Sequence, residues 1–127
     1  MNEDVKQWFE QAQADLITAG HLLSSKDYYA AVTFAQQCAE KALKAIFIFR
    51  YRKLPPKVHD LVKLGTSVGI PISISKEGEK LTGTYLSSRY PGAGPDIPVR
   101  FYDKEKAEQH IKEAEVILKW VQKKIQL

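Results

Sequence analysis

The sequence has little of what disulfide-linked and membrane-spanning proteins need. Its single cysteine, Cys38, excludes an internal disulfide and is consistent with a reducing compartment. The longest apolar run, residues 45–49, falls far short of the roughly 20 residues that a membrane-spanning helix requires. The first four residues carry no basic signal-peptide start. We therefore expect a cytoplasmic protein without a membrane segment.

Metal ligands and phosphate-binding loops are also scarce. The chain has three histidines, His21, His59 and His110. None of them has the close spacing to cysteines, carboxylates or other histidines that zinc and iron sites show. Residues 92–94 lack the third glycine and the following lysine of the known phosphate-binding loops. Cys38 lies in an apolar helical stripe, where a thiol is usually a packing residue and not a nucleophile. We expect no metal site, no cofactor and no complete catalytic set.

The composition is that of an ordinary globular protein, with 44% hydrophobic and 27% charged residues in a chain of 127. This length suits a single domain over residues 1–127 that buries its own core. The net charge is only +4, but residues 41–63 contain seven basic residues and one acidic residue, Asp60. Such a cluster attracts phosphates or an acidic partner, or it is a solvated helix end followed by a charged loop. Both interpretations stay open at this point.

Apolar residues at spacings of three and four predict three long amphipathic helices. The first runs from about residue 3 to residue 24. The second begins at Asp27, whose side chain can cap the first turn, and ends before Pro55-Pro56. The last begins at its cap Asp103 and ends near residue 125. Long helices joined by short connections predict an all-α, up-and-down helical bundle.

Two shorter helices complete a predicted bundle of four to five helices. One carries Leu61 and Leu64 on its apolar face and stops at Gly69. The other runs from about residue 76 to residue 88 and is weakened by two interior glycines. Residues 70–75 alternate like a strand but have no second strand to pair with, so we expect an extended linker whose Ser75 caps the next helix. Residues 90–98 are rich in proline and glycine and predict a long loop of the kind that is often functional.

Two pairs of neighbouring residues are candidates for binding or chemistry. Arg89 and Tyr90 lie where a helix gives way to the proline-rich loop, and they offer a cation for phosphate beside a ring for base stacking. A structural clamp is the alternative. His59 and Asp60 could work as an acid–base pair, or they could cap the start of a helix and hold the preceding loop.

Several sequence segments follow one another in a fixed order along nearly the whole chain. They are Trp8 with Ala12, Asp15 and Leu16, then Tyr28 to Phe34, then Gln36 to Ala45, then His59-Asp60-Leu61, and then Arg89-Tyr90-Pro91. Helical proteins often contain one such segment but rarely all of them in this order. Together the segments resemble the HEPN family of prokaryotes and higher eukaryotes.

This resemblance implies a bundle of about four or five helices that forms a homodimer. It also implies nucleotide or RNA binding, and a minimal nucleotidyltransferase encoded beside the protein as its partner. Members that are ribonucleases use an arginine separated by four to six residues from a histidine, with the pair gathered from two subunits. No histidine follows Arg89 at that distance, so we expect the catalytic base to be missing there. Arg52 and His59 match the spacing, but they bracket a proline loop and we interpret the match as chance.

Our leading hypothesis is a non-catalytic, homodimeric module that acts with a minimal nucleotidyltransferase. Its predicted cleft, lined by Lys44, His59, Arg89 and Tyr90, receives a nucleotide or RNA phosphate. Lys44 and Arg89 neutralise the phosphate, Tyr90 stacks on the base, and His59 donates a hydrogen bond. Salt-sensitive binding is the expected signature of such a site.

Two alternatives remain. The first is a metal-independent ribonuclease that serves as the toxin of a toxin–antitoxin pair. Some relatives are toxins modified on a tyrosine, for which Tyr90 and Tyr102 are poor substitutes. The second alternative is a purely structural protein-interaction module. Dimerisation is also suggested by the weak fourth helix and by a face of small side chains at Ala31, Ala35 and Ala39.

Overall fold

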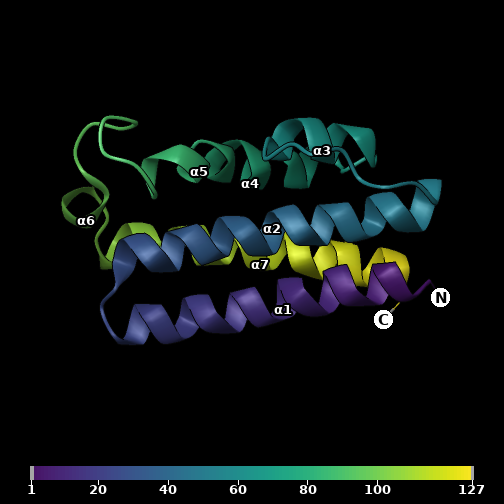
Figure 1. Ribbon diagram of the computed structural model, residues 1–127, viewed down its shortest axis with the longest axis horizontal. Helices are drawn as coiled ribbons and strands as arrows, with labels where there is room; N and C mark the ends of the chain where they lie inside the picture. Colours follow the sequence, from purple (N-terminus) through teal and green to yellow (C-terminus); the bar gives the residue numbers. More distant parts are fainter. Residues whose placement is uncertain (1, 127) are drawn as a thin grey trace.

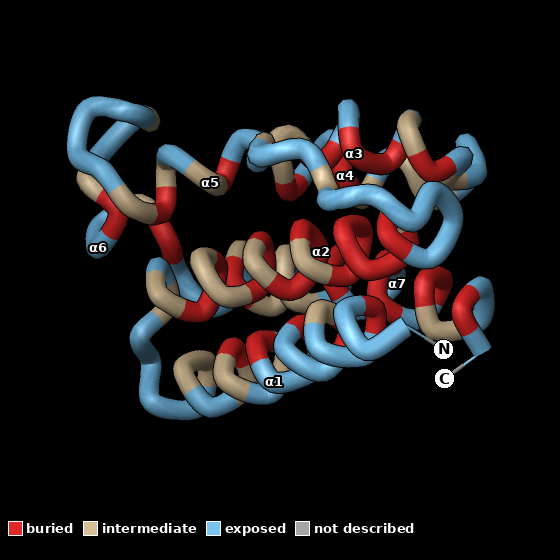
Figure 2. The backbone as a smooth tube through the Cα atoms, turned by 45° about the vertical axis from the view of Figure 1, so that its right-hand side comes forward, coloured by how far each residue is buried: buried red, intermediate tan, exposed pale blue. Residues whose placement is uncertain are grey.

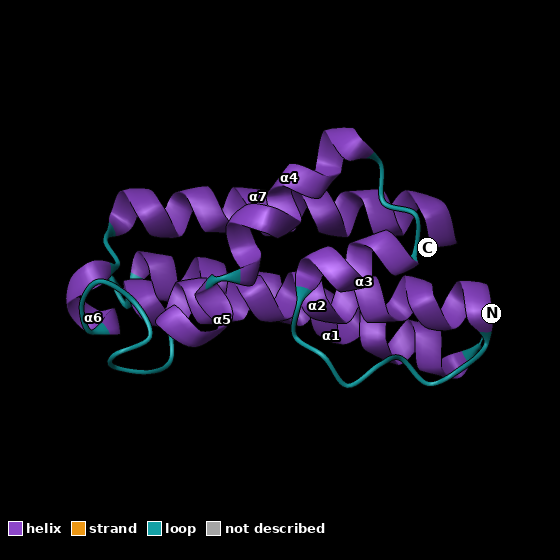
Figure 3. Ribbon diagram, turned by 90° about the horizontal axis from the view of Figure 1, so that it is seen from above, coloured by secondary structure: helices purple, strands orange, loops and turns teal. Residues whose placement is uncertain are grey.

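The computed structural model describes residues 2–126, and over these residues it contains helices, turns and loops but no strand (Figures 1 and 3). This confirms the predicted all-α bundle. None of the helices in this range combines the length and the apolar character that crossing a bilayer demands. The helices are α1 (Glu3–Ser24), α2 (Tyr28–Tyr51), α3 (Leu61–Ser67), α4 (Ile72–Thr82), α5 (Thr84–Ser87), α6 (Pro98–Phe101) and α7 (Lys104–Ile125).

The three long helices lie side by side, and α2 occupies the centre. Helix α1 packs along α2 and α7. On the other side of α2 lie α3 and α5, which pack against it, and α4, which packs mainly on α7 (Figure 1). Figure 2 shows that buried positions follow α2 along most of its length. Asn2 caps α1 by accepting the Asp4 amide, and Asp103 caps α7 by accepting the Lys106 amide, as predicted for Asp103. Asp27 stands before α2, but its carboxylate accepts the Ser25 hydroxyl and caps no amide, so this predicted cap is wrong.

The small side chains of α2 are used inside the chain. Ala31, Ala35 and Ala39 each have 0% of their surface exposed, because they lie in the two hydrophobic clusters that α2 shares with its neighbours. Small residues on a helix allow a second helix to approach closely. Our suggestion that these alanines form a dimer surface is therefore wrong, because their faces are already occupied within one chain.

The short helices differ from the prediction at their boundaries. Helix α3 ends at Ser67 and Gly69 follows with a φ of +71°, which agrees with the predicted stop. The predicted extended linker at 70–75 is wrong from Ile72 onward, because α4 begins there with Pro71 as its N-cap. Ser75 is therefore inside a helix, and its amide donates to the Pro71 carbonyl. Without a strand to pair with, this segment satisfies its backbone groups by forming helical hydrogen bonds.

Helix α4 does not continue to residue 88. It ends at Thr82, and Gly83 separates it from the single turn of α5. The following loop is irregular as predicted until α6, which is one turn long and starts with Pro98. The loop leads from α5 to the end of the bundle where α2 begins (Figure 1).

Replacing Gly20 with alanine should stabilise the protein by about 0.5–1 kcal/mol. Gly20 lies inside α1, and a Cβ atom at this position would meet nothing within 4 Å. Alanine restricts the unfolded chain and has the highest helix propensity. Urea unfolding of both proteins measures the difference. Gly92→Ala is the matched control, and it should destabilise the protein because Gly92 has a φ of +85°; no gain at Gly20 would contradict the prediction.

Candidate functional site

A buried row of polar side chains runs along one side of α2. Gln36, Glu40 and Lys44 are spaced by four residues, so they lie on one helix face. The Glu40 Oε1 atom accepts a hydrogen bond from Gln36 Nε2 at 3.1 Å, and its Oε2 atom accepts one from Lys44 Nζ at 3.0 Å. The side chains of Lys44 and Glu40 are only 8% and 6% exposed. The two charges therefore form a buried ion pair at the centre of the bundle.

His59 joins this ion pair from the loop before α3. Its Nδ1 atom lies 2.9 Å from Glu40 Oε1, and its backbone carbonyl accepts a hydrogen bond from Gln36. An ionised carboxylate only accepts hydrogen bonds, so Nδ1 carries the proton and donates it. The His59 side chain is 48% exposed, and its Nε2 atom has no hydrogen-bond partner among residues 2–126. Glu40 thus fixes the orientation of the imidazole ring.

The electrostatics of Glu40 keep it charged. Burial raises the pKa of this carboxyl, but hydrogen bonds from Gln36, His59 and Lys44 and the charge of Lys44 outweigh burial, so its pKa is lowered from its ordinary value. Glu40 is consequently an anion at neutral pH and a hydrogen-bond acceptor for all three neighbours.

Three planar groups are stacked next to this cluster. The rings of His59 and Tyr85 are nearly parallel, with centroids 3.9 Å apart and an interplanar angle of 12°. The guanidinium carbon of Arg89 lies 4.1 Å from the centroid of the Tyr85 ring. Both groups are too close to share one face of the ring, so Tyr85 lies between them. One Arg89 nitrogen donates to the Tyr85 carbonyl at 2.8 Å, and the remaining N–H groups have no acceptor among residues 2–126.

The structure brings three of the four predicted site residues together. Lys44 and His59 share the carboxylate of Glu40, and Arg89 reaches His59 through the Tyr85 ring. Tyr90 follows Arg89 directly and is 53% exposed, and within the described range no side-chain hydrogen bond or ring stacking joins it to the stack. The prediction that these four residues bind a ligand stays a prediction.

Sequence reasoning gave no role in this site to Gln36, Glu40 and Tyr85. The signal was the spacing of four residues, both from Gln36 to Glu40 to Lys44 and from Tyr85 to Arg89. Polar residues that interrupt the apolar side of a central helix must find partners when they are buried. That requirement could have identified Glu40, but only the structure shows that His59 is its partner.

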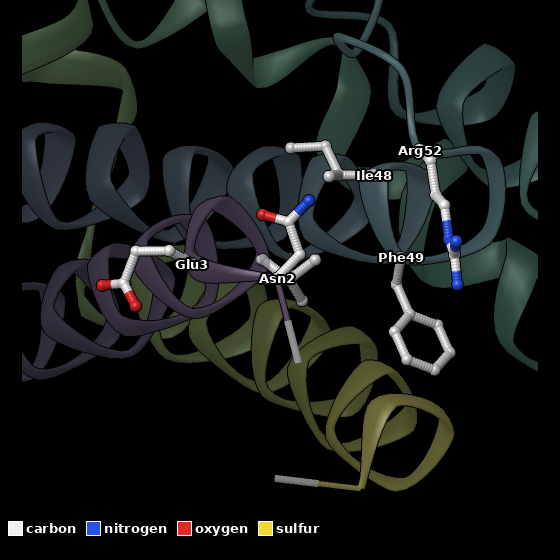
Figure 4. A pocket seen from close by; sticks show the side chains of 6 residues that line it. Asn2, Glu3, Ile48, Phe49 and Arg52 are labelled. Atoms are coloured by element: carbon white, nitrogen blue, oxygen red, sulfur yellow. The ribbon is translucent and has the colours of Figure 1, made fainter.

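The arginine and histidine that match the ribonuclease spacing lie apart in this chain. Arg52 ends α2 in a left-handed conformation, with a φ of 51°. It lines a cavity of about 430 Å³ near the start of α1, together with Asn2 and Phe49 (Figure 4). His59 contacts α2 at Glu40, and the twelve residues from Glu40 to Arg52 correspond to roughly 18 Å along the helix. Arg52 and His59 do not form a pair within one chain.

Part of the basic stretch at 41–63 is used for structure. Lys41 pairs with Asp15, Lys44 pairs with Glu40, and Arg50 donates to the Val68 carbonyl. The other cations have no ion pair within residues 2–126, and they are Arg52, Lys53, Lys57 and Lys63. The internal use of Lys41, Lys44 and Arg50 was not among the two interpretations of this stretch. That the unpaired cations attract phosphates or an acidic partner stays a prediction.

Cys38 has the character predicted for it. It is fully buried in the core, and burial raises the pKa of its thiol, followed by the effect of nearby Asp15. A buried, neutral thiol is a packing group. No group of three or more histidine, cysteine or acidic side chains is gathered as a metal site in the part of the chain that the structure describes.

The helical bundle and its sequence define the class of protein. Residues 5–125 match the family model described as HEPN domain, and the chain belongs to this family. Among solved structures, TT1696 from Thermus thermophilus is 32% identical with a TM-score of 0.87, and the match covers 98% of this chain and 99% of that one. ST0689, an archaeal HEPN homologue, is 32% identical with a TM-score of 0.83 and the same coverage.

A more distant structure has the same fold. A HEPN domain protein of Thermotoga maritima, tm0613, is 22% identical with a TM-score of 0.74, and the match covers 94% of this chain and 98% of that one. No curated protein matches the sequence. The resemblance to the HEPN family, which was inferred from the succession of sequence segments, is thereby confirmed.

Proposed function

We propose that this HEPN-domain protein binds a nucleotide or the phosphate of an RNA at the stack formed by His59, Tyr85 and Arg89. The observation that carries this proposal is the position of Arg89, whose guanidinium lies over a tyrosine ring and keeps N–H groups without protein acceptors among residues 2–126. A guanidinium held in this way matches the oxygens of a phosphate and needs little reorganisation to bind them.

Each member of the site has a role that follows from its geometry. Arg89 contacts the phosphate, and the Nε2 atom of His59, whose side chain is 48% exposed, hydrogen bonds to the same group or to the sugar. Tyr90 is exposed beside Arg89 and supplies a ring on which a base stacks. Lys44 is buried against Glu40, so in this proposal it supports the site by holding Glu40 and does not contact the phosphate itself.

The proposal includes a homodimer and a protein partner. Apolar side chains are exposed on the elements at the end of the bundle that carries the proline-rich loop. Besides Tyr90, which is assigned to the ligand, they are Tyr29 on α2, Leu86 on α5 and Val99 on α6. Exposed apolar side chains that lie together are typical of contact surfaces. We place the contact with a second copy of the chain at this end, which leaves the remaining surface for a minimal nucleotidyltransferase.

Replacing Arg89 with alanine should weaken nucleotide or RNA binding about tenfold to a hundredfold, because the variant cannot form a charge-assisted hydrogen bond to phosphate. Isothermal titration with ATP, GTP and a short single-stranded RNA at two salt concentrations measures this effect. In wild type, binding should weaken as salt rises. The variant should lower the slope of log K against log salt by roughly 0.7 for each phosphate that it no longer neutralises.

Arg100→Ala is the matched control for Arg89→Ala. It removes the same charge from the neighbouring α6, but Arg100 is exposed and paired with Asp96. This variant should bind like wild type. Affinity that does not depend on salt, or equal weakening by both variants, would contradict the proposed site. No heat with any ligand would favour the protein-interaction alternative.

One observation keeps the ribonuclease alternative in view. His59 is oriented through Nδ1 by a buried carboxylate, which is the arrangement of a general base. Arg89 could supply the cation that such a reaction needs at the phosphate. The RNA from the titrations can be analysed on a denaturing gel. Cleavage by wild type and none by His59→Ala would support a nuclease, whereas intact RNA after long incubation would exclude it for that substrate.

A further inference from the structure

A groove between α1 and α2 lies outside the proposed phosphate site. It has a volume of about 300 Å³ and is lined by Gln7, Trp8, Gln11 and Lys41. Small-molecule pockets begin at about this volume. The groove therefore has room for one planar group the size of a nucleobase, with an aromatic ring at its wall and polar side chains around it.

The ring of Trp8 is held in place. It is half-buried against the hydrophobic core, and the ammonium group of Lys44 lies 5.7 Å from the ring centroid. Lys44 is itself held by its ion pair with Glu40. The Trp8 indole therefore contacts an ordered ammonium group on its buried side, and it also lines the groove. A ring that is ordered before the ligand arrives loses little entropy when a base stacks on it.

The polar rim of the groove is ordered by a buried carboxylate. Asp15 accepts hydrogen bonds from Gln11 Nε2 at 3.0 Å and from Lys41 Nζ at 2.6 Å, and the Asp15 side chain is only 3% exposed. This leaves the side-chain carbonyl oxygen of Gln11 as an acceptor and the exposed amide of Gln7 as a donor or acceptor. Amide groups of this kind can pair with the edges of a base.

A series of side-chain contacts links the groove to the phosphate site through the buried pair of Lys44 and Glu40. Trp8 contacts Lys44, Lys44 contacts Glu40, and Glu40 contacts His59, which stacks on Tyr85 beside Arg89. The ion cluster lies between the two aromatic surfaces, so one base cannot stack on both. Aromatic rings arranged along a path with cationic side chains are typical of proteins that bind single-stranded nucleic acids.

We propose that the groove at Trp8 is a second subsite, which takes a nucleobase of a single-stranded oligonucleotide whose phosphate is bound at Arg89. This inference rests on the proposed function and makes it more specific, because the ligand is then longer than a single nucleotide. One base stacks on the Trp8 ring between Gln7 and Gln11. The buried pair of Lys44 and Glu40 separates this base from the phosphate at Arg89.

The experiment compares ligands of increasing length. Adenosine monophosphate, a dinucleotide and a tetranucleotide of RNA, and a DNA tetranucleotide of the same sequence, are titrated into wild type, Trp8→Ala and Arg89→Ala. Wild type should bind the tetranucleotide about fivefold to a hundredfold more tightly than the monophosphate, because an additional base is stacked. Trp8→Ala should lose this gain with length and keep its affinity for the monophosphate.

Two further variants keep the test valid if Trp8→Ala fails to fold. Trp8→Phe retains a stacking ring, so it should keep most of the gain with length but lose the quenching of tryptophan fluorescence that the tetranucleotide causes in wild type. Phe49→Ala is the matched aromatic control, because Phe49 is 41% exposed and lines the separate cavity at the end of α2 (Figure 4). It should bind all ligands like wild type.

The outcomes separate this inference from the proposed function. An unchanged gain with length in Trp8→Ala, or no quenching in wild type, overturns the subsite while a loss in Arg89→Ala still supports phosphate binding. Loss of the gain in Trp8→Ala without any effect of Arg89→Ala supports the subsite and overturns the proposed role of Arg89. Binding of none of the ligands by wild type overturns both. Equal binding of RNA and DNA supports a subsite that contacts the base and not the sugar.

Discussion

Replacing Glu40 with alanine is expected to lower the free energy of unfolding by about 3–5 kcal/mol. The substitution removes the partner of the Lys44 ammonium, which is buried and would remain as an uncompensated charge. It also removes the acceptor for Gln36 and for His59. Chemical denaturation monitored by circular dichroism at neutral pH measures the loss.

Two comparisons isolate the cause of this loss. Glu115→Ala removes a carboxylate from an exposed pair with Lys119, and it should cost less than about 1 kcal/mol. The double variant Glu40→Leu, Lys44→Met removes both buried charges, so it should recover much of the stability. If Glu40→Ala were as mild as Glu115→Ala, the buried ion pair would not have the importance that its geometry indicates.

The pH dependence of stability supplies an internal check on Glu40. The pKa of this carboxyl is lower in the folded protein than its ordinary value of 4.5. Its contribution is therefore complete above about pH 4.5 and is lost as the pH falls toward the lower folded pKa, because the unfolded state then binds the proton first. The difference in stability between wild type and Glu40→Ala should shrink over that acidic range.

Leu43→Ala is expected to destabilise the protein by about 2–5 kcal/mol. Leu43 is completely buried in the main core cluster of α2, so its truncation removes apolar packing and leaves a cavity. The cost should appear as a lower denaturation midpoint with an unchanged slope, since the extent of unfolding does not change. Leu54→Ala is the same substitution in the loop after α2, where the side chain is 86% exposed.

Leu43→Ala and Leu54→Ala remove the same atoms, so the expected difference in their effects on stability comes from the burial of the side chain. The Leu54 variant should lie within about 0.5 kcal/mol of wild type. A small effect at Leu43 would mean that the surrounding helices close around the space, which the close packing of small side chains on α2 makes difficult.

The long helices could be predicted from the sequence because their signals are local. Apolar spacing and the cap at Asp103 each depend on a few neighbouring residues, and these predictions are confirmed, as is the stop of the short α3 at Gly69. The start of α4 could not be predicted in the same way. Residues 70–75 alternate like a strand, and only the absence of a pairing strand within residues 2–126 and the packing of Ile74 on the core explain why they turn into a helix.

In the candidate site, too, the features with local sequence signals could be predicted, and those that depend on tertiary packing could not. Arg89 and Tyr90 could be recognised because a cation and a ring next to a proline-rich loop are visible in the sequence. Glu40 and His59 are nineteen residues apart, and their hydrogen bond depends on the path of the loop between α2 and α3. The burial of Lys44 also follows from tertiary packing, which is why the sequence alone gave this residue a direct role at the phosphate.

The two ends of the described chain lie at one end of the bundle, near the start of α1 and the end of α7, while the loop at 91–97 lies at the other end (Figure 1). If the protein were immobilised on a solid support through either terminus, the proline-rich loop would therefore point away from the support. The same arrangement suits circular permutation, because a short linker could join the old ends and a cut in the loop would leave every long helix intact.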